Sequence, residues 1–407
     1  MTDNRLYWIW LQQALEPGGV KTALALSAFA SPEAIHRASR AELMRAGFTG
    51  ALLARLCRKS LDPAARILED SLKDGAFVLT MGDDAYPDCL RNTYMPPLVL
   101  YGKGELPPLD RLPAVAMVGT RKASGYGCRA ASSIAAGLAA GGCIVISGGA
   151  VGIDGASHRG ALAGGGLTIA VQGCGLDVDY PKPNRRLREE ILAADGVIVT
   201  EYPPGSPPLR EHFPVRNRLL AGMAMAVCVV EAPERSGSLI TARLARNQGR
   251  DVYVVPGEIT SGNSSGSNDL IKDGAALITK ASEILRDYAP RFPDVLDLRA
   301  ADAAQAASRG GGTAKVSAAG SKASAAPPAP VKVEPAPVPP AFSPCPAGAS
   351  PGAALLYQML TPEPLAAEIL AQKAGLAFPA ALAGLTELEI AGCARNFPGR
   401  QFALRPL

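Results

Sequence analysis

The 407-residue sequence has few of the residues on which metal sites and many catalytic sites depend. It contains three histidines and eight scattered cysteines, and no two cysteines form a CxxC pair. Closely spaced cysteines and histidines are the usual mark of a zinc site, so we expect neither a metal nor another cofactor. The cysteines are predicted to be reduced and mostly buried, as in a cytoplasmic protein.

Long apolar runs and a strong charge imbalance are also missing. No run approaches the ~20 apolar residues that span a bilayer, and the N-terminus MTDNRLYWIW resembles no secretion signal. We therefore expect an intracellular protein that does not bind membranes. The net charge of +4 is too small to predict nucleic-acid binding by itself, so such a role requires a local basic patch.

Two nucleotide-binding fingerprints are absent as well, although the chain has glycine-rich turns. Neither GxGxxG nor the P-loop ending GK[ST] occurs between residues 115 and 154. Instead, two short apolar runs each end in a turn of small residues, of the kind that lets backbone amides approach an anion. Such turns also serve merely to pack a helix on a strand, but Arg121 and Lys122 favour an anion. The candidate contacts in these turns are Gly119, Thr120, Arg121, Ser124, Ser147, Gly148 and Gly149.

Apolar runs and helical patterns alternate from residue 112 to about residue 288, which predicts a doubly wound α/β domain. The carboxyl ends of parallel strands meet at one edge of a sheet, so the loops after them should converge there. These later loops add the candidates Lys182, Arg210, Phe213, Arg216, Asn217, Arg218, Ser236, Gly237 and Ser238. Guanidinium groups bind phosphates and an aromatic ring stacks on a base. The alternatives are that the arginines of the RNR segment are ion-paired and that Phe213 is a core residue.

The remaining segments predict three further parts. Residues 1–80 read as short helices, and the loop at residues 17–21 resembles a helix-hairpin-helix turn that grips a DNA phosphate, although a plain packing module is the favoured interpretation. Residues 81–298 form the α/β domain. Residues 299–351, rich in Ala, Pro, Ser and Gly, predict a disordered linker. Three helical patterns and a hairpin in residues 352–407 predict a winged helix.

Catalysis has little support in the sequence. Asp154 and His158 are four residues apart on a predicted helix, so they could form a structural pair, and Cys174 lies between two glycines. No motif places a nucleophile beside a base, so we expect no enzymatic activity.

Several segments together resemble one known family. VGTRKASGYG, ISGGAVGIDGASHRGAL, TEYPPGSPP, FPVRNRLLAG and VVEAPERSGSLITARLA occur in the order expected of the DNA-processing protein A (DprA/Smf) family. The resemblance implies an extended Rossmann-like domain that binds single-stranded DNA, forms a homodimer and loads RecA recombinase during natural transformation. By motif, it assigns DNA contacts to Gly119, Arg121, Ser147, Gly148, Gly149, Arg210 and Phe213.

The main alternative is an enzyme, a nucleotide-processing phosphoribohydrolase of the lysine-decarboxylase-like type. Those enzymes carry PGGxGTxxE, and this sequence departs from that signature at Glu258, directly after Pro256 and Gly257. A scaffold without DNA binding is a second alternative, and it leaves the arginines of the loops unexplained.

Overall fold

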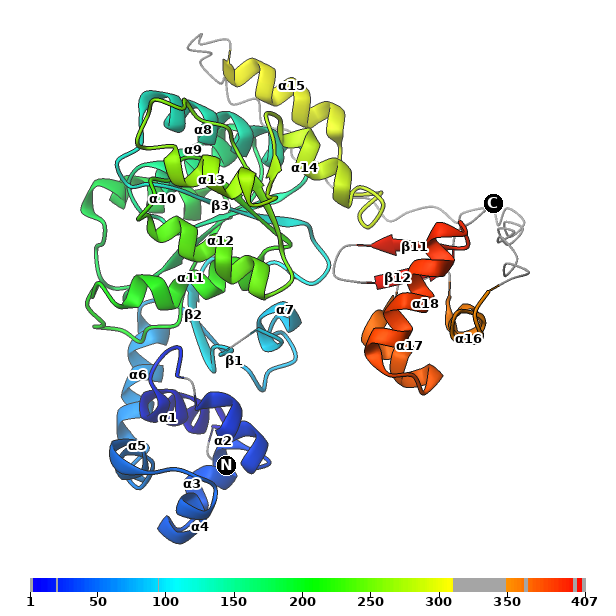
Figure 1. Cartoon of the computed structure of the whole chain (residues 1–407). Helices are drawn as coiled ribbons and strands as arrows, with labels where there is room; N and C mark the ends of the chain where they lie inside the picture. The colour runs from blue at the N-terminus through cyan, green and yellow to red at the C-terminus, as the bar shows by residue number, and fades with distance from the viewer. Residues whose placement is uncertain are drawn as a thin grey trace, which may run out of the picture. The chain divides into compact units, whose positions relative to one another are not determined.

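The computed structural model describes residues 3–19, 21–93, 95–309, 349–361, 365–397 and 401–404. The chain forms two compact units, Met1–Gly312 and Thr313–Leu407 (Figure 1). Among the described residues, no helix is long and apolar enough to cross a bilayer.

The first unit begins with six short helices, drawn in blue in Figure 1. They are α1 (Arg5–Leu15), α2 (Thr22–Ala28), α3 (Pro32–Arg37), α4 (Arg40–Arg45), α5 (Gly50–Leu56) and α6 (Asp62–Lys73). The hydroxyls of Ser31 and Ser39 cap α3 and α4 by accepting backbone N–H bonds. The short helices predicted for residues 1–80 are present. These helices share one core with the neighbouring strand residues Val78, Val99 and Tyr101, so they belong to the α/β body.

A nine-stranded sheet forms the centre of this unit. Its strands are β1 (Phe77–Thr80), β2 (Val99–Lys103), β3 (Ala114–Val118), β4 (Ile144–Ser147), β5 (Thr168–Gln172), β6 (Val197–Thr200), β7 (Ala226–Val229), β8 (Asp251–Val254) and β9 (Ala276–Leu277). The spatial order is β1-β2-β6-β5-β4-β3-β7-β8-β9. The seven strands β6-β5-β4-β3-β7-β8-β9 are parallel to one another. Strands β1 and β2 form an antiparallel edge next to β6. The predicted doubly wound α/β fold is confirmed.

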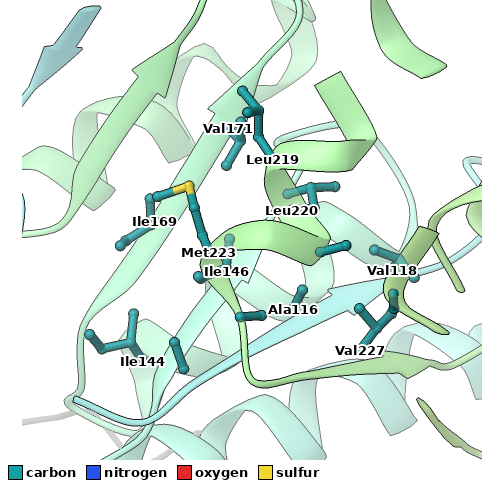
Figure 2. Packing of buried hydrophobic residues seen from close by; sticks show 14 of the residues in the cluster. Ala116, Val118, Ile144, Ile146, Ile169, Val171, Leu219, Leu220, Met223 and Val227 are labelled. Atoms are coloured by element: carbon teal, nitrogen blue, oxygen red, sulfur yellow. The ribbon is translucent and has the colours of Figure 1, made fainter. Parts of the chain in front are cut away.

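Helices cover both faces of the sheet. They are α7 (Asp88–Arg91), α8 (Gly125–Ala140), α9 (Ile153–Ala163), the 3-10 turn η1 (Lys182–Asn184), α10 (Arg185–Ala193), α11 (His212–Met223), α12 (Gly237–Asn247), α13 (Ser265–Lys272), α14 (Ala281–Tyr288) and α15 (Leu298–Arg309). Successive side chains of a strand point to opposite faces. Ala116 and Val118 of β3 therefore join the core under α11 and α12 (Figure 2), whereas Val115 and Met117 join the core under α8 and α14.

The predicted start of the linker is wrong. Residues 299–309 belong to α15, which packs on α8, and Ser133 Oγ donates to the backbone oxygen of Gln305 at 3.4 Å. The alanines that suggested a linker are small enough for close packing, and Ala301 is fully buried. Residues 310–348 of the predicted linker lie outside the described residues, and its last residue, Pro351, begins the next helix.

The second unit has the elements of a winged helix. Helices α16 (Pro351–Met359), α17 (Ala367–Ala374) and α18 (Phe378–Ile390) accompany the strands β10 (Leu365–Ala366), β11 (Ala394–Phe397) and β12 (Gln401–Leu404). The strands form an antiparallel sheet in the order β10-β12-β11. Leu356, Leu370, Leu385 and Phe402 are buried in a core of their own. The predicted hairpin is present, and its turn at Pro398 and Gly399 lies outside the described residues.

Candidate nucleic-acid interface

The strand order creates a crevice between the loops that follow β3 and β7. From β3 the chain proceeds to β4, β5 and β6 on one side, and then returns to place β7 on the other side of β3. Open α/β sheets bind ligands at the carboxyl ends of strands where the order reverses in this way. A cleft of about 600 Å³ opens at this position. Four arginines and one aspartate line it, namely Arg121, Arg210, Arg216, Arg235 and Asp154.

Arg121, Tyr180 and Phe213 lie together in the lining of the cleft. The guanidinium carbon of exposed Arg121 lies 4.6 Å from the centre of the Phe213 ring, and the Tyr180 and Phe213 ring centres are 5.6 Å apart. Phe213 is only partly buried, so part of its ring remains accessible. The ring provides a stacking surface for a base, and the guanidinium group beside it provides hydrogen-bond donors for a phosphate. Tyr180 was not selected from the sequence, although it lies in the same loop as Lys182.

Arg216 lies at the floor of the cleft and is 3% exposed. Its Nη1 donates to the backbone oxygen of Val171 at 2.8 Å, and among the described residues its Nε has no hydrogen-bond partner. The guanidinium group passes so close to Gly148 that any Cβ at that position would overlap it. A side chain at position 148 would therefore displace the arginine, and the DNA contact of Gly148 stays a prediction.

Asp154 and Arg216, which both line the cleft, shift each other's pKa. Burial raises the pKa of Asp154 above its ordinary value, while the positive charge of Arg216 opposes this shift. Burial also lowers the pKa of Arg216, and Asp154 counteracts that effect. An arginine stays protonated at any physiological pH, so the floor keeps a fixed positive charge.

The N-terminus of α12 also lines the cleft. Ser236 caps the helix by accepting from the backbone N–H of Ser238 at 3.3 Å, and Arg235, Ser236, Gly237 and Ser238 line the cleft. A helix N-terminus carries partial positive charge and favours an anion. Asn217 donates its Nδ2 to the backbone oxygen of Gly237 at 3.3 Å, which fixes the start of α12 to α11.

Other predicted contacts have internal roles in the structure. Ser147 is fully buried and donates to the backbone oxygen of Met117 at 2.7 Å. The Thr120 side chain accepts from the Lys122 backbone at 3.2 Å. The backbone oxygen of Gly149 accepts from Asn184 at 3.0 Å. These residues shape the two turns. Gly119 and Thr120 also line the cleft, whereas the exposed Lys182 is outside its lining.

Arg218 does not reach the cleft. Its side chain is 1% exposed and its Nη2 lies 2.6 and 2.7 Å from the two carboxylate oxygens of Glu201. The predicted DNA contact by Arg218 is therefore wrong, and the alternative of an ion-paired arginine in the RNR segment applies to this residue. Helical spacing explains the difference, because positions 216 and 218 point about 200° apart on a helix of 3.6 residues per turn.

The carboxylate of Glu231, a residue that the sequence alone does not mark as part of the site, binds a backbone amide of the first glycine-rich turn. Glu231 follows β7, is 1% exposed, and its Oε2 accepts from the backbone N–H of Ser124 at 2.8 Å at the start of α8. The Ser124 hydroxyl in turn caps α8 by accepting from Gly127 at 3.0 Å. The chain's own carboxylate thus binds where a Rossmann domain places a dinucleotide phosphate, so Ser124 is used within the protein.

The suggested pair of Asp154 and His158 is not formed. His158 is fully buried, and its Nδ1 lies 2.7 Å from the hydroxyl of Thr168. Asp154 instead accepts from the backbone N–H of Ala150 at 3.3 Å. The two side chains therefore serve different parts of the fold.

Comparisons with known proteins agree with this architecture. The family described as DNA recombination-mediator protein A matches residues 77–289, and the DprA winged helix domain matches residues 334–400. DNA processing protein DprA of Streptococcus pneumoniae is 46% identical over 206 residues, covering 51% of this chain and 72% of the relative. A putative DprA of Mycobacterium tuberculosis is 40% identical over 292 residues, covering 68% of this chain and 73% of the relative.

A solved structure shares the fold. The X-ray structure of S. pneumoniae DprA aligns with a TM-score of 0.59 at 35% identity, covering 68% of this chain and 97% of that one. Both regions identified from the sequence, the α/β domain and the winged helix, thus have counterparts in one family. The chain belongs to the DprA/Smf family and has a DNA-processing role in recombination.

Proposed function

We propose that this protein binds single-stranded DNA in the cleft and loads RecA recombinase onto it. The observation that carries the proposal is the composition of the cleft, where four arginines and the accessible ring of Phe213 surround a single aspartate. Phosphates bind the arginines and the α12 N-terminus, and bases stack on Phe213. Backbone charge and base stacking together favour single strands, in which the bases are free to stack on a protein ring.

The residues near the cleft argue for binding rather than catalysis. Burial raises the pKa of the Cys174 thiol to about 11, which disfavours the reactive thiolate. His212 stacks on Tyr202 with ring centres 4.0 Å apart, and its Nδ1 lies 3.1 Å from the backbone oxygen of Gly173. Glu258, the position compared with the phosphoribohydrolase signature, is exposed outside the cleft lining. We therefore favour a non-enzymatic role over the hydrolase alternative.

Titration of fluorescent single-stranded DNA with the full chain, by anisotropy at several salt concentrations, tests the binding step. We expect affinity to fall linearly with the logarithm of salt concentration, as for a protein that neutralises phosphates. Duplex DNA of the same length should bind more weakly. Equal affinity for both forms, or hydrolysis of nucleoside monophosphates by the protein, contradicts the proposal.

RecA loading requires a separate assay. Single-stranded DNA coated with a single-stranded DNA-binding protein slows RecA filament assembly, and this chain should shorten that delay. The DNA-dependent ATPase activity of RecA reports filament assembly. If the delay is unchanged while DNA binding is intact, the chain binds DNA without mediating RecA loading.

We also propose a homodimer formed through the α/β domain. The edge strand β9 supports this proposal, because both of its residues are exposed and Leu277 is 52% exposed. An open sheet edge is a template for pairing with another chain. Light scattering should give twice the chain mass, and Leu277→Lys should reduce it to one chain.

A further inference from the structure

Helix α11 lies between the cleft and the N-terminal helices. Phe213, Arg216, Asn217 and Leu220 of α11 line the cleft. Val215 and Arg218 project from the opposite side, because 3.6 residues per turn place them about half a turn away. That opposite side faces the loop after α1, where a Cβ on Gly18 would lie 2.5 Å from the Val215 side chain and 3.6 Å from Arg218 Nε.

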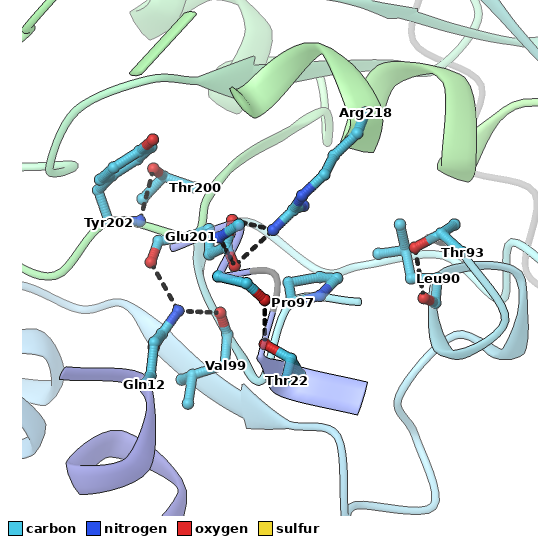
Figure 3. A network of polar contacts seen from close by, with 12 residues as sticks. Gln12, Thr22, Leu90, Thr93, Pro97, Val99, Thr200, Glu201, Tyr202 and Arg218 are labelled. Atoms are coloured by element: carbon cyan, nitrogen blue, oxygen red, sulfur yellow. Dashed lines mark hydrogen bonds and ion pairs between the residues drawn. The ribbon is translucent and has the colours of Figure 1, made fainter. Parts of the chain in front are cut away.

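A buried polar network, which we call the Glu201 network, connects α1 and the loop after it to Arg218 of α11 (Figure 3). It consists of Gln12, Gly18, Glu201 and Arg218. The Glu201 carboxylate accepts from Arg218 and, at 3.3 Å, from the backbone N–H of Gly18. Gln12 Nε2 in α1 donates to the backbone oxygens of Glu201 at 2.9 Å and Val99 at 3.2 Å.

The three side chains of the network are buried. Glu201 is 2% exposed, Gln12 is 3% exposed and Arg218 is 1% exposed. Removing one partner from a buried ion pair leaves an uncompensated charge, so the network holds its members in one arrangement. The Gly18 amide is already bonded to Glu201, which leaves it unavailable to the DNA phosphate that a helix-hairpin-helix turn would bind.

We propose that the N-terminal helices are a positioning element of the DNA cleft. Through Gly18 and the Glu201 network they fix the position of α11, and thereby aim Phe213 and Arg216 into the cleft. This inference rests on the proposed binding of single-stranded DNA to that cleft. The N-terminal helices contribute to DNA affinity without touching DNA.

A pair of glycine substitutions tests the proposal. Gly18 has φ +71° and Gly75, at the end of α6, has φ +70°, so alanine introduces the same backbone strain at both positions. Only at Gly18 does the new methyl group press on α11, since no atom lies within 4 Å of a Cβ on Gly75. We expect Gly18→Ala to weaken single-stranded DNA binding roughly three- to tenfold, and Gly75→Ala to leave it unchanged.

A double-mutant cycle separates positioning from general destabilisation. If Gly18→Ala acts by moving Phe213, it should cost little further affinity in a Phe213→Ala background. Gln12→Met, which removes the Nε2 donor at similar volume, should reproduce the loss if Gly18→Ala does not fold. Full additivity, or equal affinities of the Gly18→Ala and Gly75→Ala proteins, overturns the inference. Wild-type protein that does not bind single-stranded DNA overturns the proposed function instead.

Discussion

Three arginines near the cleft show how neighbouring groups decide the use of one residue type. Arg121 is exposed and lies against the Phe213 ring. Arg216 is buried, and its Nε has no hydrogen-bond partner in the part of the chain that the structure describes, whereas Arg218 forms an ion pair with Glu201. Only the first two line the cleft. Arg121 is the more accessible of the two and is therefore the first test of DNA binding.

Arg121→Ala should weaken single-stranded DNA binding for all sequences, because a phosphate contact carries no base information. The slope of log affinity against log salt should fall by about 1 unit or less. Arg243→Ala is the matched control, since Arg243 is also exposed but lies farther along α12 and outside the cleft lining. Anisotropy titrations of both variants provide the measurement. A folded Arg121→Ala protein with the wild-type slope and affinity removes Arg121 from the site.

Phe213→Ala tests the stacking surface. Gly173 lies beneath the ring, and the exposed part of the ring faces the cleft. Loss of a stacked base should cost about 1–3 kcal/mol of DNA binding free energy with little change in melting temperature. Phe213→Trp should retain most of the affinity. If the melting temperature instead falls in proportion to the affinity, the alternative of a core residue is correct.

His158 gives the folded protein a specific pH dependence. The Thr168 hydroxyl donates to the Val145 oxygen at 2.7 Å, so it must accept from His158 Nδ1, which places the neutral ring's proton there. Burial lowers the pKa of His158 from 6.5 to about 3. Between these values the unfolded chain binds a proton that the folded chain does not, so the free energy of unfolding falls as pH falls.

From pH 7 to pH 5 this histidine should remove about 2 kcal/mol from the free energy of unfolding. His158→Gln lacks a titrating group and should show a correspondingly smaller loss. Urea unfolding of both proteins at the two pH values measures the difference. Identical losses in the two proteins would show that His158 becomes protonated without unfolding.

At the scale of elements, the start of α8 illustrates a site whose anion is part of the protein. Ser124 caps the helix and its backbone amide binds Glu231. Ser124→Ala should therefore lower the free energy of unfolding by about 1 kcal/mol through the lost cap. DNA affinity should stay at the wild-type value, although the sequence suggested a contact. A loss of affinity without a loss of stability would return Ser124 to the DNA site.

The elements themselves were largely predictable from the sequence. Buried parallel strands require continuous apolar runs, and those at residues 168–171 and 226–230 coincide with β5 and β7 within one residue. Helix α15 was missed because its alanine-rich sequence resembles a linker, and only its packing on α8 distinguishes the two. Propensity alone does not report such tertiary contacts.

The fate of individual polar side chains was less predictable. Helical spacing places Arg216 and Arg218 on opposite sides of a helix, but the RNR segment does not show which of them is ion-paired. That depends on where Glu201 lies after folding. The partner of Ser124, Glu231, is 107 residues away in the sequence. This contact forms because β7 lies beside β3 in the sheet. A single sequence does not show which strands are neighbours, so it does not show which distant residues meet.

At the scale of the whole molecule, the winged helix raises the question of duplex DNA. Winged and helix-turn-helix domains usually read the major groove with one helix. Here that helix, α18, holds no Arg, Lys, Asn or Gln. It carries Glu387 and Glu389, and Glu387 accepts from the backbone and hydroxyl of Ser350 at 2.8 and 2.6 Å. The hydroxyl of Thr386 in this helix donates to the backbone oxygen of Leu382 at 2.9 Å. The helix therefore offers no long polar side chain to a base edge, and its carboxylates repel phosphates.

We therefore expect the C-terminal unit to bind a protein partner rather than DNA. Deletion of residues 310–407 should leave most of the affinity for single-stranded DNA intact, since the cleft lies entirely in the first unit. The deletion begins after Arg309 because α15 belongs to the α/β body. The isolated unit, residues 349–407, has its own buried core and can be tested alone. If it binds duplex DNA at micromolar concentration and physiological salt, this assignment is wrong, and Arg395, Arg400 and Arg405 become the candidates for the contact.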